Sequence, residues 1–176
     1  GARFVEVDIQ LTADLQPVLY HDRDMQRLSG VEQRVQDLSY AALCSYRLLN
    51  PAEFGERFQD EPIAHLRQLV ELIGRHPGVT FFIEFKRVAV LQVGAAAFLQ
   101  TALPWLQPVA SQTVVISYDV ALVALAAAQG WRVGWVTDSL PQADWQAQLG
   151  LVPEYLFLDY AALTGYPLAQ QKTTWG

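Results

Sequence analysis

Short apolar runs alternate along this chain with segments that have helical periodicity. The runs are nearly continuous in Val, Ile, Leu and Phe, which is typical of strands that are buried on both faces. Helical patterns cover 62–75, 90–106, 120–129 and 143–149, and a short return strand is predicted at 17–20. Strands that alternate with helices usually pair in parallel, because each helix returns the chain to the same end of the sheet. The apolar runs are 4–11, 79–86, 113–119, 132–137 and 154–159.

Composition places the chain among packed globular proteins. Of its 176 residues, 52% are apolar and 17% are charged, so one core and one domain are expected over 1–176. A net charge of −6, without a basic stripe, argues against nucleic-acid binding. Cys44 is the only cysteine, which excludes an intramolecular disulfide and a thiolate metal cluster. We expect a cytoplasmic protein without a transmembrane segment in this chain, because no apolar run reaches roughly 18 residues.

Most of the apolar runs end in polar residues. Glu6 and Asp8 lie in the first run, Glu84 and Lys86 lie in the second, and polar residues at 117, 119, 137, 138 and 159 close the others. In a β/α barrel the active site is built at the carboxyl ends of the strands. An open doubly wound sheet binds its ligands at the same end. The pattern therefore predicts where a site lies and leaves these two α/β architectures open.

Three carboxylates occupy strand positions where apolar residues would be expected. Side chains at i and i+2 of a strand point the same way, so Glu6 and Asp8 share a face. In the second run, Glu84 and Lys86 share a face with Phe82. Carboxylates from two strands would make an all-oxygen site, which favours Mg²⁺ or Ca²⁺ over zinc. An internal Glu–Lys salt-bridge cluster explains the same residues equally well, and both interpretations stay open.

Three motifs resemble those of the glycerophosphodiester phosphodiesterase family. They are EVDIQLTADLQPVLYHD at 6–22, IEFK at 83–86 and ISYD at 116–119, of which the first is long and specific. The resemblance implies a (β/α)8 TIM-type barrel that hydrolyses small-molecule glycerophosphodiesters to glycerol 3-phosphate and an alcohol, using a divalent metal. It implies that Glu6, Asp8 and Glu84 are the metal ligands. It also implies that His21 is a catalytic general acid or base and that Lys86 binds the substrate phosphate.

The resemblance covers only part of the family pattern. The family's first strand carries a His-Arg-Gly motif followed by Pro-Glu-Asn, and a later strand carries Trp-Thr-Val-Asn. A barrel of this kind has about 250 residues, so we expect an incomplete barrel with strands 2–6 of eight, and strands 1, 7 and 8 absent. The second catalytic histidine and a phosphate-binding arginine are then expected before Gly1, and this stretch alone is expected to be inactive. Residues 23–61 match the family's small insertion after the second strand.

Other polar residues have simpler interpretations. His65 and His76 are expected to be bystanders, in the 62–75 helix and in the turn after it. Asp22 either orients the preceding histidine or caps a turn. Ser117 and Asp119 are expected to line the pocket without a catalytic role.

Two other functions stay open from the sequence. A related phospholipase D-type phosphodiesterase would act on lysophospholipid headgroups, and an apolar groove beside the site would distinguish it. A non-catalytic binding protein would keep the barrel and lose the chemistry. The presence together of Glu6, Asp8, His21, Glu84 and Lys86 weighs against that second alternative.

Overall fold

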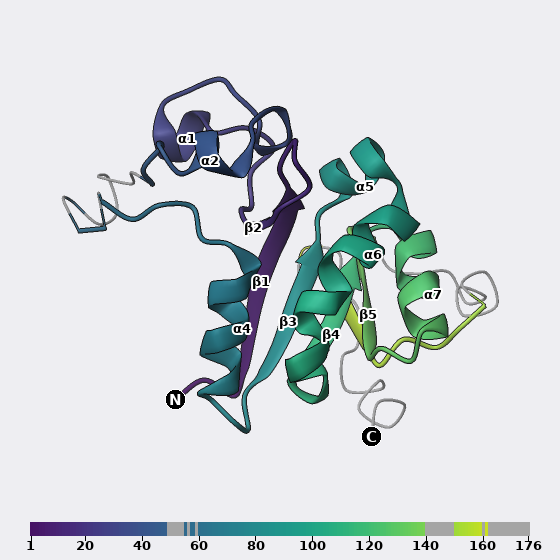
Figure 1. Cartoon of the computed structure of the whole chain (residues 1–176). Coiled ribbons are helices and arrows are strands. Elements are labelled where there is room, and N and C mark those ends of the chain that lie inside the picture. The colour runs from purple at the N-terminus through teal and green to yellow at the C-terminus, as the bar shows by residue number, and fades with distance from the viewer. Residues whose placement is uncertain (49–54, 56, 59, 140–149, 160, 162–176) are drawn as a thin grey trace.

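One sheet organises the computed structural model, which describes residues 1–48, 55, 57–58, 60–139, 150–159 and 161. In this part of the chain, six strands lie in the order β2-β1-β3-β4-β5-β6 (Figure 1). The short β2 (Pro17–Leu19) is antiparallel to β1, as predicted for the return strand. The other strands pair in parallel, each within a predicted apolar run. They are β1 (Phe4–Leu11), β3 (Thr80–Phe85), β4 (Thr113–Ser117), β5 (Val133–Thr137) and β6 (Tyr155–Leu158).

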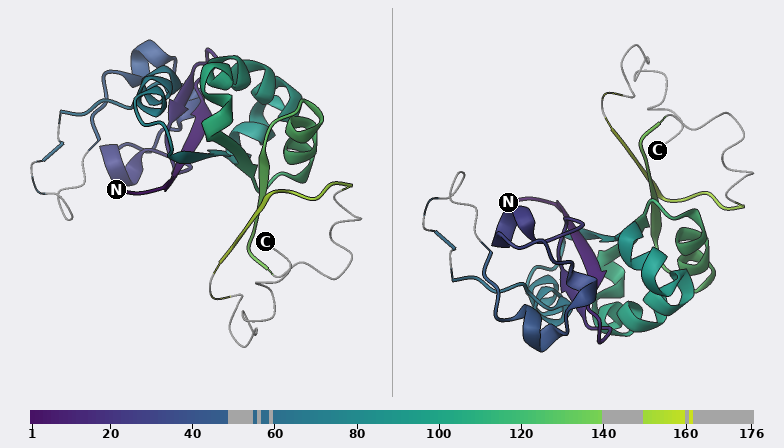
Figure 2. Two further views of the ribbon diagram at one scale, coloured as in Figure 1. Left: turned by 90° about the horizontal axis from the view of Figure 1, so that it is seen from below. Right: turned by 90° about the horizontal axis from the view of Figure 1, so that it is seen from above.

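Helices connect β1 to β3, β3 to β4 and β4 to β5, and the longer ones lie together on one side of the sheet (Figure 2). The connection from β3 to β4 contains two α-helices and a 3₁₀ segment, and the connection from β4 to β5 contains one α-helix. Shorter helical turns lie between β2 and the first long helix. The helical elements are α1 (Gln26–Ser29), η1 (Val35–Asp37), α2 (Tyr40–Leu43), α4 (Leu66–Gly74), α5 (Arg87–Val93), α6 (Ala95–Leu106), η2 (Gln107–Gln112) and α7 (Val120–Ala128).

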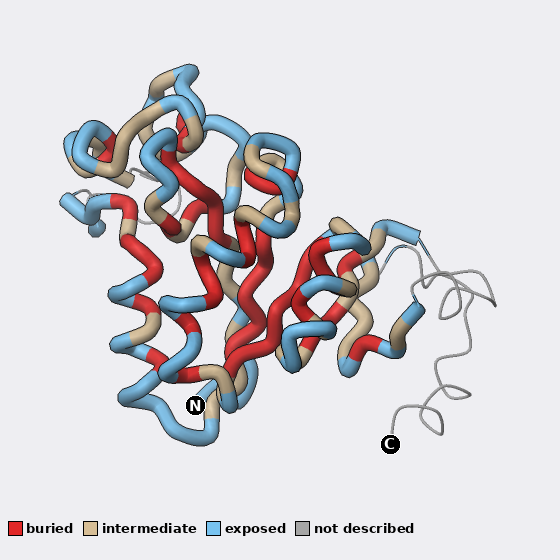
Figure 3. Tube along the Cα trace, turned by 45° about the vertical axis from the view of Figure 1, so that its right-hand side comes forward, coloured by how far each residue is buried: buried red, intermediate tan, exposed pale blue. Residues whose placement is uncertain are grey.

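The face of the sheet that the helices cover, here called the outer face, forms the main core with them. The opposite face is called the inner face. Ile9, Ile83 and Val115 are fully buried on three neighbouring strands, and the central strands are the most buried part of the chain (Figure 3). The ring of Phe85 lies 4.8 Å from the ring of Phe98 on α6. Burial of each such side chain contributes about 1.5–3 kcal/mol, so this layer is a main source of stability for the scaffold.

The inner face of the sheet carries a smaller apolar layer below the predicted site. The ring of Phe82 contacts Tyr155 and Phe157 edge-on, with centroids 4.8 Å and 5.0 Å apart. Gly134 makes room for this layer, because a Cβ atom there would lie 2.9 Å from Cγ2 of Ile116 and 3.2 Å from Cβ of Tyr155. This packing supports the strand ends that carry the polar residues.

The prediction of one continuous helix over 90–106 is wrong. It consists of α5 and α6, which are separated at Gly94 with a φ of 83°. Such a positive φ favours glycine, because a Cβ atom would clash with the backbone there. Pro104 lies inside α6, which continues to Leu106. The predicted helix at 143–149 lies outside the described residues.

The insertion has a small core of its own beside β2. Met25, Val35 and Leu43 are fully buried there and pack with Val18 and Ile63. Residues 23–48 therefore form a packed cap near the carboxyl end of β1, where the predicted site lies.

None of the described helices is by itself both long and apolar enough to cross a bilayer, and one pair, α5 with the segment 95–112, reaches that length only jointly, across a bend of 114°.

His65 stabilises the start of α4 and is not part of that helix. Its Nδ1 accepts a hydrogen bond from the backbone N–H of Arg67 at 2.9 Å, and Gln68 Oε1 accepts one from the backbone N–H of His65. The imidazole is buried between Tyr40 and Trp105, with ring centroids 5.2 Å and 4.9 Å away. The predicted helix start at 62 is therefore too early, because the helix begins at Leu66.

Replacing His65 with alanine is expected to lower the free energy of unfolding by about 2 kcal/mol. The change removes a helix cap, worth about 1 kcal/mol, and two aromatic contacts worth about 0.5–1.5 kcal/mol each. Chemical denaturation would measure the effect. His65→Asn, which retains a capping oxygen, should lose less stability, and an unchanged stability in His65→Ala would contradict this role.

Candidate active site

The predicted carboxylates meet where the middle of β1 lies beside the carboxyl end of β3. The parallel register pairs Asp8 with Glu84, so Glu6, Asp8 and Glu84 lie on the inner face of the sheet. One carboxylate oxygen from each lies within 4.8 Å of the others. The structure thus brings together the three residues that the sequence predicts as metal ligands. The oxygens are close enough for one cation to contact all three.

Lys86 also joins this cluster, because its side chain turns back onto the inner face. Its Nζ lies 3.1 Å from Oδ1 of Asp8 and 3.0 Å from Oε1 of Glu84. Burial alone would lower the pKa of Lys86, but Glu84 and Asp8 together raise it. The internal salt bridge considered from the sequence is therefore present, and it occupies the same place as the carboxylate cluster.

The carboxylate cluster has more negative charge than Lys86 neutralises. Glu6 is the most exposed of the three carboxylates, but its partial desolvation, reinforced by the charges of Asp8 and Glu84, raises its pKa to about 7 against the opposing effect of Lys86. Within the described residues, Oε1 of buried Glu84 accepts no hydrogen bond of good geometry, although Lys86 Nζ is close. An all-oxygen donor set with more negative charge than its ammonium partner neutralises fits a hard divalent cation.

Metal affinity is expected to rise with pH and to level off above about pH 7, where Glu6 is ionised. Below that pH the cation must displace a proton from Glu6, so affinity should fall by up to about tenfold per pH unit. Calorimetric titration of Mg²⁺ and Ca²⁺ between about pH 5 and pH 8 would measure this. Glu6→Gln should bind more weakly and lose most of the pH dependence. A pH-independent affinity in the unsubstituted protein would contradict the assignment.

His21 stands at the edge of the site, held by Asp22. The imidazole is 65% exposed, and its Nδ1 lies 2.8 Å from Oδ1 of Asp22. Arg27 donates two hydrogen bonds to the same carboxylate, from Nε at 2.7 Å and Nη2 at 3.1 Å. Hydrogen bonds from Arg27 and His21 lower the pKa of Asp22, so it remains ionised. Of the two interpretations of Asp22, orientation of the histidine is the one that these contacts support.

Gln10 fixes the loop that carries His21 to the sheet. This buried residue donates from Nε2 to the backbone carbonyls of Tyr20 at 3.0 Å and Asp22 at 2.7 Å. Sequence reasoning did not single out Gln10 or Arg27. The inward position of Gln10, two residues beyond Asp8 on the same strand, is a signal that could have identified it.

Ser117 and Asp119 do not line the site. Ser117 is buried and donates to the carbonyl of Phe85 at 2.7 Å, and Asp119 caps α7 by accepting from the N–H of Leu122 at 2.8 Å. The residue between them, Tyr118, instead reaches Asp138. The prediction for Ser117 and Asp119 is thus wrong, because the alternating strand pattern directs Tyr118, not its neighbours, to the inner face.

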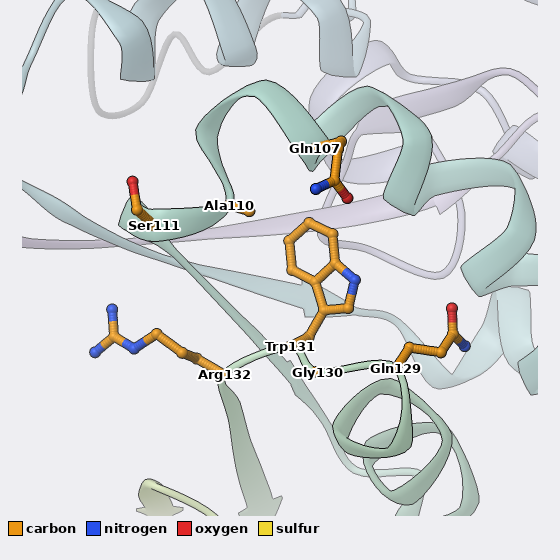
Figure 4. Close-up of a pocket in the computed structure, with 7 residues that line it drawn as sticks. All are labelled: Gln107, Ala110, Ser111, Gln129, Gly130, Trp131 and Arg132. Carbon is orange, nitrogen blue, oxygen red and sulfur yellow. The ribbon is translucent and has the colours of Figure 1, made fainter.

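Two cavities lie outside the carboxylate cluster. One of about 300 Å³ lies at the opposite end of the sheet, where Trp131 stands between α7 and β5 near Gln107 (Figure 4). It contains none of the predicted site residues. The other, of about 380 Å³, lies between the insertion and α5. Its lining is Arg23, Arg34, Gln36, Val88, Leu91 and Gln92.

Comparison with known proteins identifies the family. The profile of the glycerophosphoryl diester phosphodiesterase family matches residues 1–93, which include all five predicted site residues. The chain belongs to this family. It is 35% identical over 109 residues to glycerophosphodiester phosphodiesterase 1 of Mus musculus, covering 60% of this chain and 32% of that protein. It is 36% identical over 74 residues to the glycerophosphodiester phosphodiesterase of Caldanaerobacter subterraneus, covering 42% of this chain and 30% of that protein.

Solved structures show the same fold. The structure of a phosphodiesterase from Oleispira antarctica in complex with the product sn-glycerol-3-phosphate superimposes with a TM-score of 0.77 at 19% identity, covering 99% of this chain and 70% of that one. A glycerophosphodiester phosphodiesterase from Parabacteroides distasonis gives a TM-score of 0.73 at 20% identity, covering 99% and 68%. The sheet is thus part of a TIM-type barrel, as predicted. The chain spans about a third of the length of the curated relatives named above.

Proposed function

We propose that the protein hydrolyses glycerophosphodiesters to glycerol 3-phosphate and an alcohol, with Mg²⁺ or Ca²⁺ held by Glu6, Asp8 and Glu84. The observation that carries the proposal is the group of three carboxylates, with oxygens within 4.8 Å, at the strand ends of a chain in this family. The product found in the Oleispira antarctica structure supports the reaction. A bound divalent ion supplies Lewis-acid stabilisation of the charge that develops on the phosphate.

His21 is the residue that transfers a proton in this proposal. Its contact with Asp22 favours a proton on Nδ1 and leaves Nε2 as the acceptor. An imidazole nitrogen with a free lone pair can accept a proton from a reacting group and return it, as a general acid–base residue must. Because Asp22 is itself fixed by Arg27, the ring has a preferred orientation although it is exposed.

Lys86 places a positive charge directly beside the carboxylates of Asp8 and Glu84. Its Nζ contacts Asp8 and Glu84, and a substrate phosphate beside the cation would compete for the same ammonium. As a point charge with rotatable donors, a lysine can serve both partners without a fixed geometry.

A lysophospholipid headgroup is the second candidate substrate, and the cavity between the insertion and α5 favours it. Leu91 on that cavity is 75% exposed, and Val88 lies two residues after Lys86. Val88 and Leu91 are the two apolar residues among the six that line this cavity, and apolar contacts are what an acyl chain requires. Faster hydrolysis of lysophosphatidylcholine than of glycerophosphocholine would favour this substrate.

The deciding experiment is an assay of the full-length protein on glycerophosphocholine and glycerophosphoethanolamine, with and without EDTA. Release of glycerol 3-phosphate should stop on full chelation and return with Mg²⁺ or Ca²⁺. Activity that survives chelation would contradict the metal assignment. An inactive full-length protein with either ion would contradict the proposal and favour a non-catalytic binding protein.

A further inference from the structure

Tyr118 and Asp138 lie on the inner face beside the candidate site. The register of β3 and β4 pairs Glu84 with Ile116, and two residues further along these chains are Lys86 and Tyr118. Within one strand, side chains two residues apart point to the same face, so Lys86 and Tyr118, each just beyond its strand, follow the face of Glu84 and Ile116. Neighbouring strands are about 4.8 Å apart. Asp138 follows directly after β5, the next strand of the sheet.

A hydrogen bond joins the two residues across the strand ends. The hydroxyl of Tyr118 donates to Oδ1 of Asp138 at 2.9 Å. Burial and Asp138 raise the pKa of Tyr118 to about 12, and the charges of Glu84 and Lys86 also act on it. Tyr118 is thus a neutral donor that holds Asp138 in place, and it lies within electrostatic range of the carboxylate cluster.

The pair presents an aromatic ring next to an uncompensated negative charge. Tyr118 is 38% exposed. Across the described parts of the chain, Asp138 has no contact with a cationic side chain and no hydrogen bond other than that from Tyr118. Lys86, the cation whose charge acts on Tyr118, is bound by Asp8 and Glu84.

This combination suits one kind of ligand. A carboxylate attracts a cation, and a tyrosine face stabilises an ammonium group within about 6 Å of its centroid. A neutral alcohol gains neither the ionic attraction nor the cation–π interaction. The ring of Tyr118 and the second oxygen of Asp138 would therefore discriminate between alcohols by charge.

We propose that Tyr118 and Asp138 form a subsite for an ammonium group on the alcohol part of the substrate, as in choline or ethanolamine. The inference rests on the proposed hydrolysis of glycerophosphodiesters and names the class of diester that the site prefers. Tyr118 contacts the ammonium group with its ring and orients Asp138 with its hydroxyl.

Substrate preference tests the subsite. In the full-length protein, Asp138→Asn is expected to lower kcat/KM for glycerophosphocholine about tenfold, but less than about twofold for glycerophosphoglycerol. Tyr118→Phe keeps the ring and removes the hydroxyl, so a smaller loss of about threefold with the same preference is expected. Glu71→Gln removes an equal charge from the exposed surface of α4 and should change neither value. Equal losses on both substrates in Asp138→Asn, or no loss on either, would overturn the proposal.

A binding measurement separates this subsite from the reaction itself. Glycerophosphocholine and glycerophosphoglycerol are titrated by calorimetry into His21→Ala, which retains the carboxylate cluster, with and without Asp138→Asn. The choline diester should bind more tightly, and Asp138→Asn should abolish the difference. If the full-length protein hydrolyses neither diester, the proposed function fails and this titration alone decides the subsite. Equal affinity for the two diesters before Asp138 is replaced would overturn it.

Discussion

Replacing Glu84 with glutamine is expected to reduce kcat/KM on glycerophosphocholine by about three orders of magnitude or more. Glutamine has the same shape but removes one anionic oxygen ligand from a cluster of three. The amide also removes one of the two ionic partners of Lys86, whose Nζ stays near Asp8. The measurement pairs steady-state kinetics with calorimetric titration of Mg²⁺ and Ca²⁺, and both activity and metal affinity should fall together.

Stability separates this loss of metal from a loss of fold. Without metal, Glu84→Gln should unfold at nearly the same denaturant concentration as the unsubstituted protein, because it removes one of the two carboxylate charges that, after desolvation, raise the pKa of Glu6. Glu71→Gln, an equal change on the exposed side of α4, provides the matched control and should keep full activity. Retained activity with retained metal affinity in Glu84→Gln would show that the cluster is structural.

The strand period explains why the carboxylate cluster could be predicted from the sequence. Alternation along β1 and β3 assigns Glu6, Asp8 and Glu84 to one face, and parallel pairing brings the two strands into register. Apolar runs likewise predict the strands, because burial on both faces leaves few other patterns. These are properties of single segments, which a sequence displays directly.

Contacts between distant segments were the part that the sequence could not supply. Tyr118 and Asp138 meet only because β4 and β5 are neighbours, and Arg27 reaches Asp22 only because the insertion folds back. The break at Gly94 was missed for a different reason. A glycine followed by alanines is compatible with a continuous helix. The helix breaks at Gly94 because α5 and α6 must run in different directions to pack on the sheet, and local sequence does not encode that direction.

Replacing Lys86 with methionine tests whether a divalent cation binds the same carboxylates that form the salt bridge with Lys86. The substitution keeps most of the side-chain volume but leaves Asp8 and Glu84, whose side chains are only 14% and 11% exposed, without their cation. Breaking a pair with this degree of burial is expected to cost about 2–3 kcal/mol in the presence of EDTA. Chemical denaturation at neutral pH measures this cost.

Added metal should then reverse most of the loss in Lys86→Met. A divalent ion in the carboxylate cluster replaces the missing charge, so metal should stabilise the variant more than the unsubstituted protein, in which Lys86 already neutralises part of the cluster. Arg75→Met removes an exposed cation at the end of α4 and should show no added response to metal. An equal metal response in Lys86→Met and the unsubstituted protein would mean that the ion does not bind where Lys86 does. A larger response places the cation and the ammonium in one shared site, where Lys86 bridges Asp8 and Glu84 and offsets their repulsion before metal arrives.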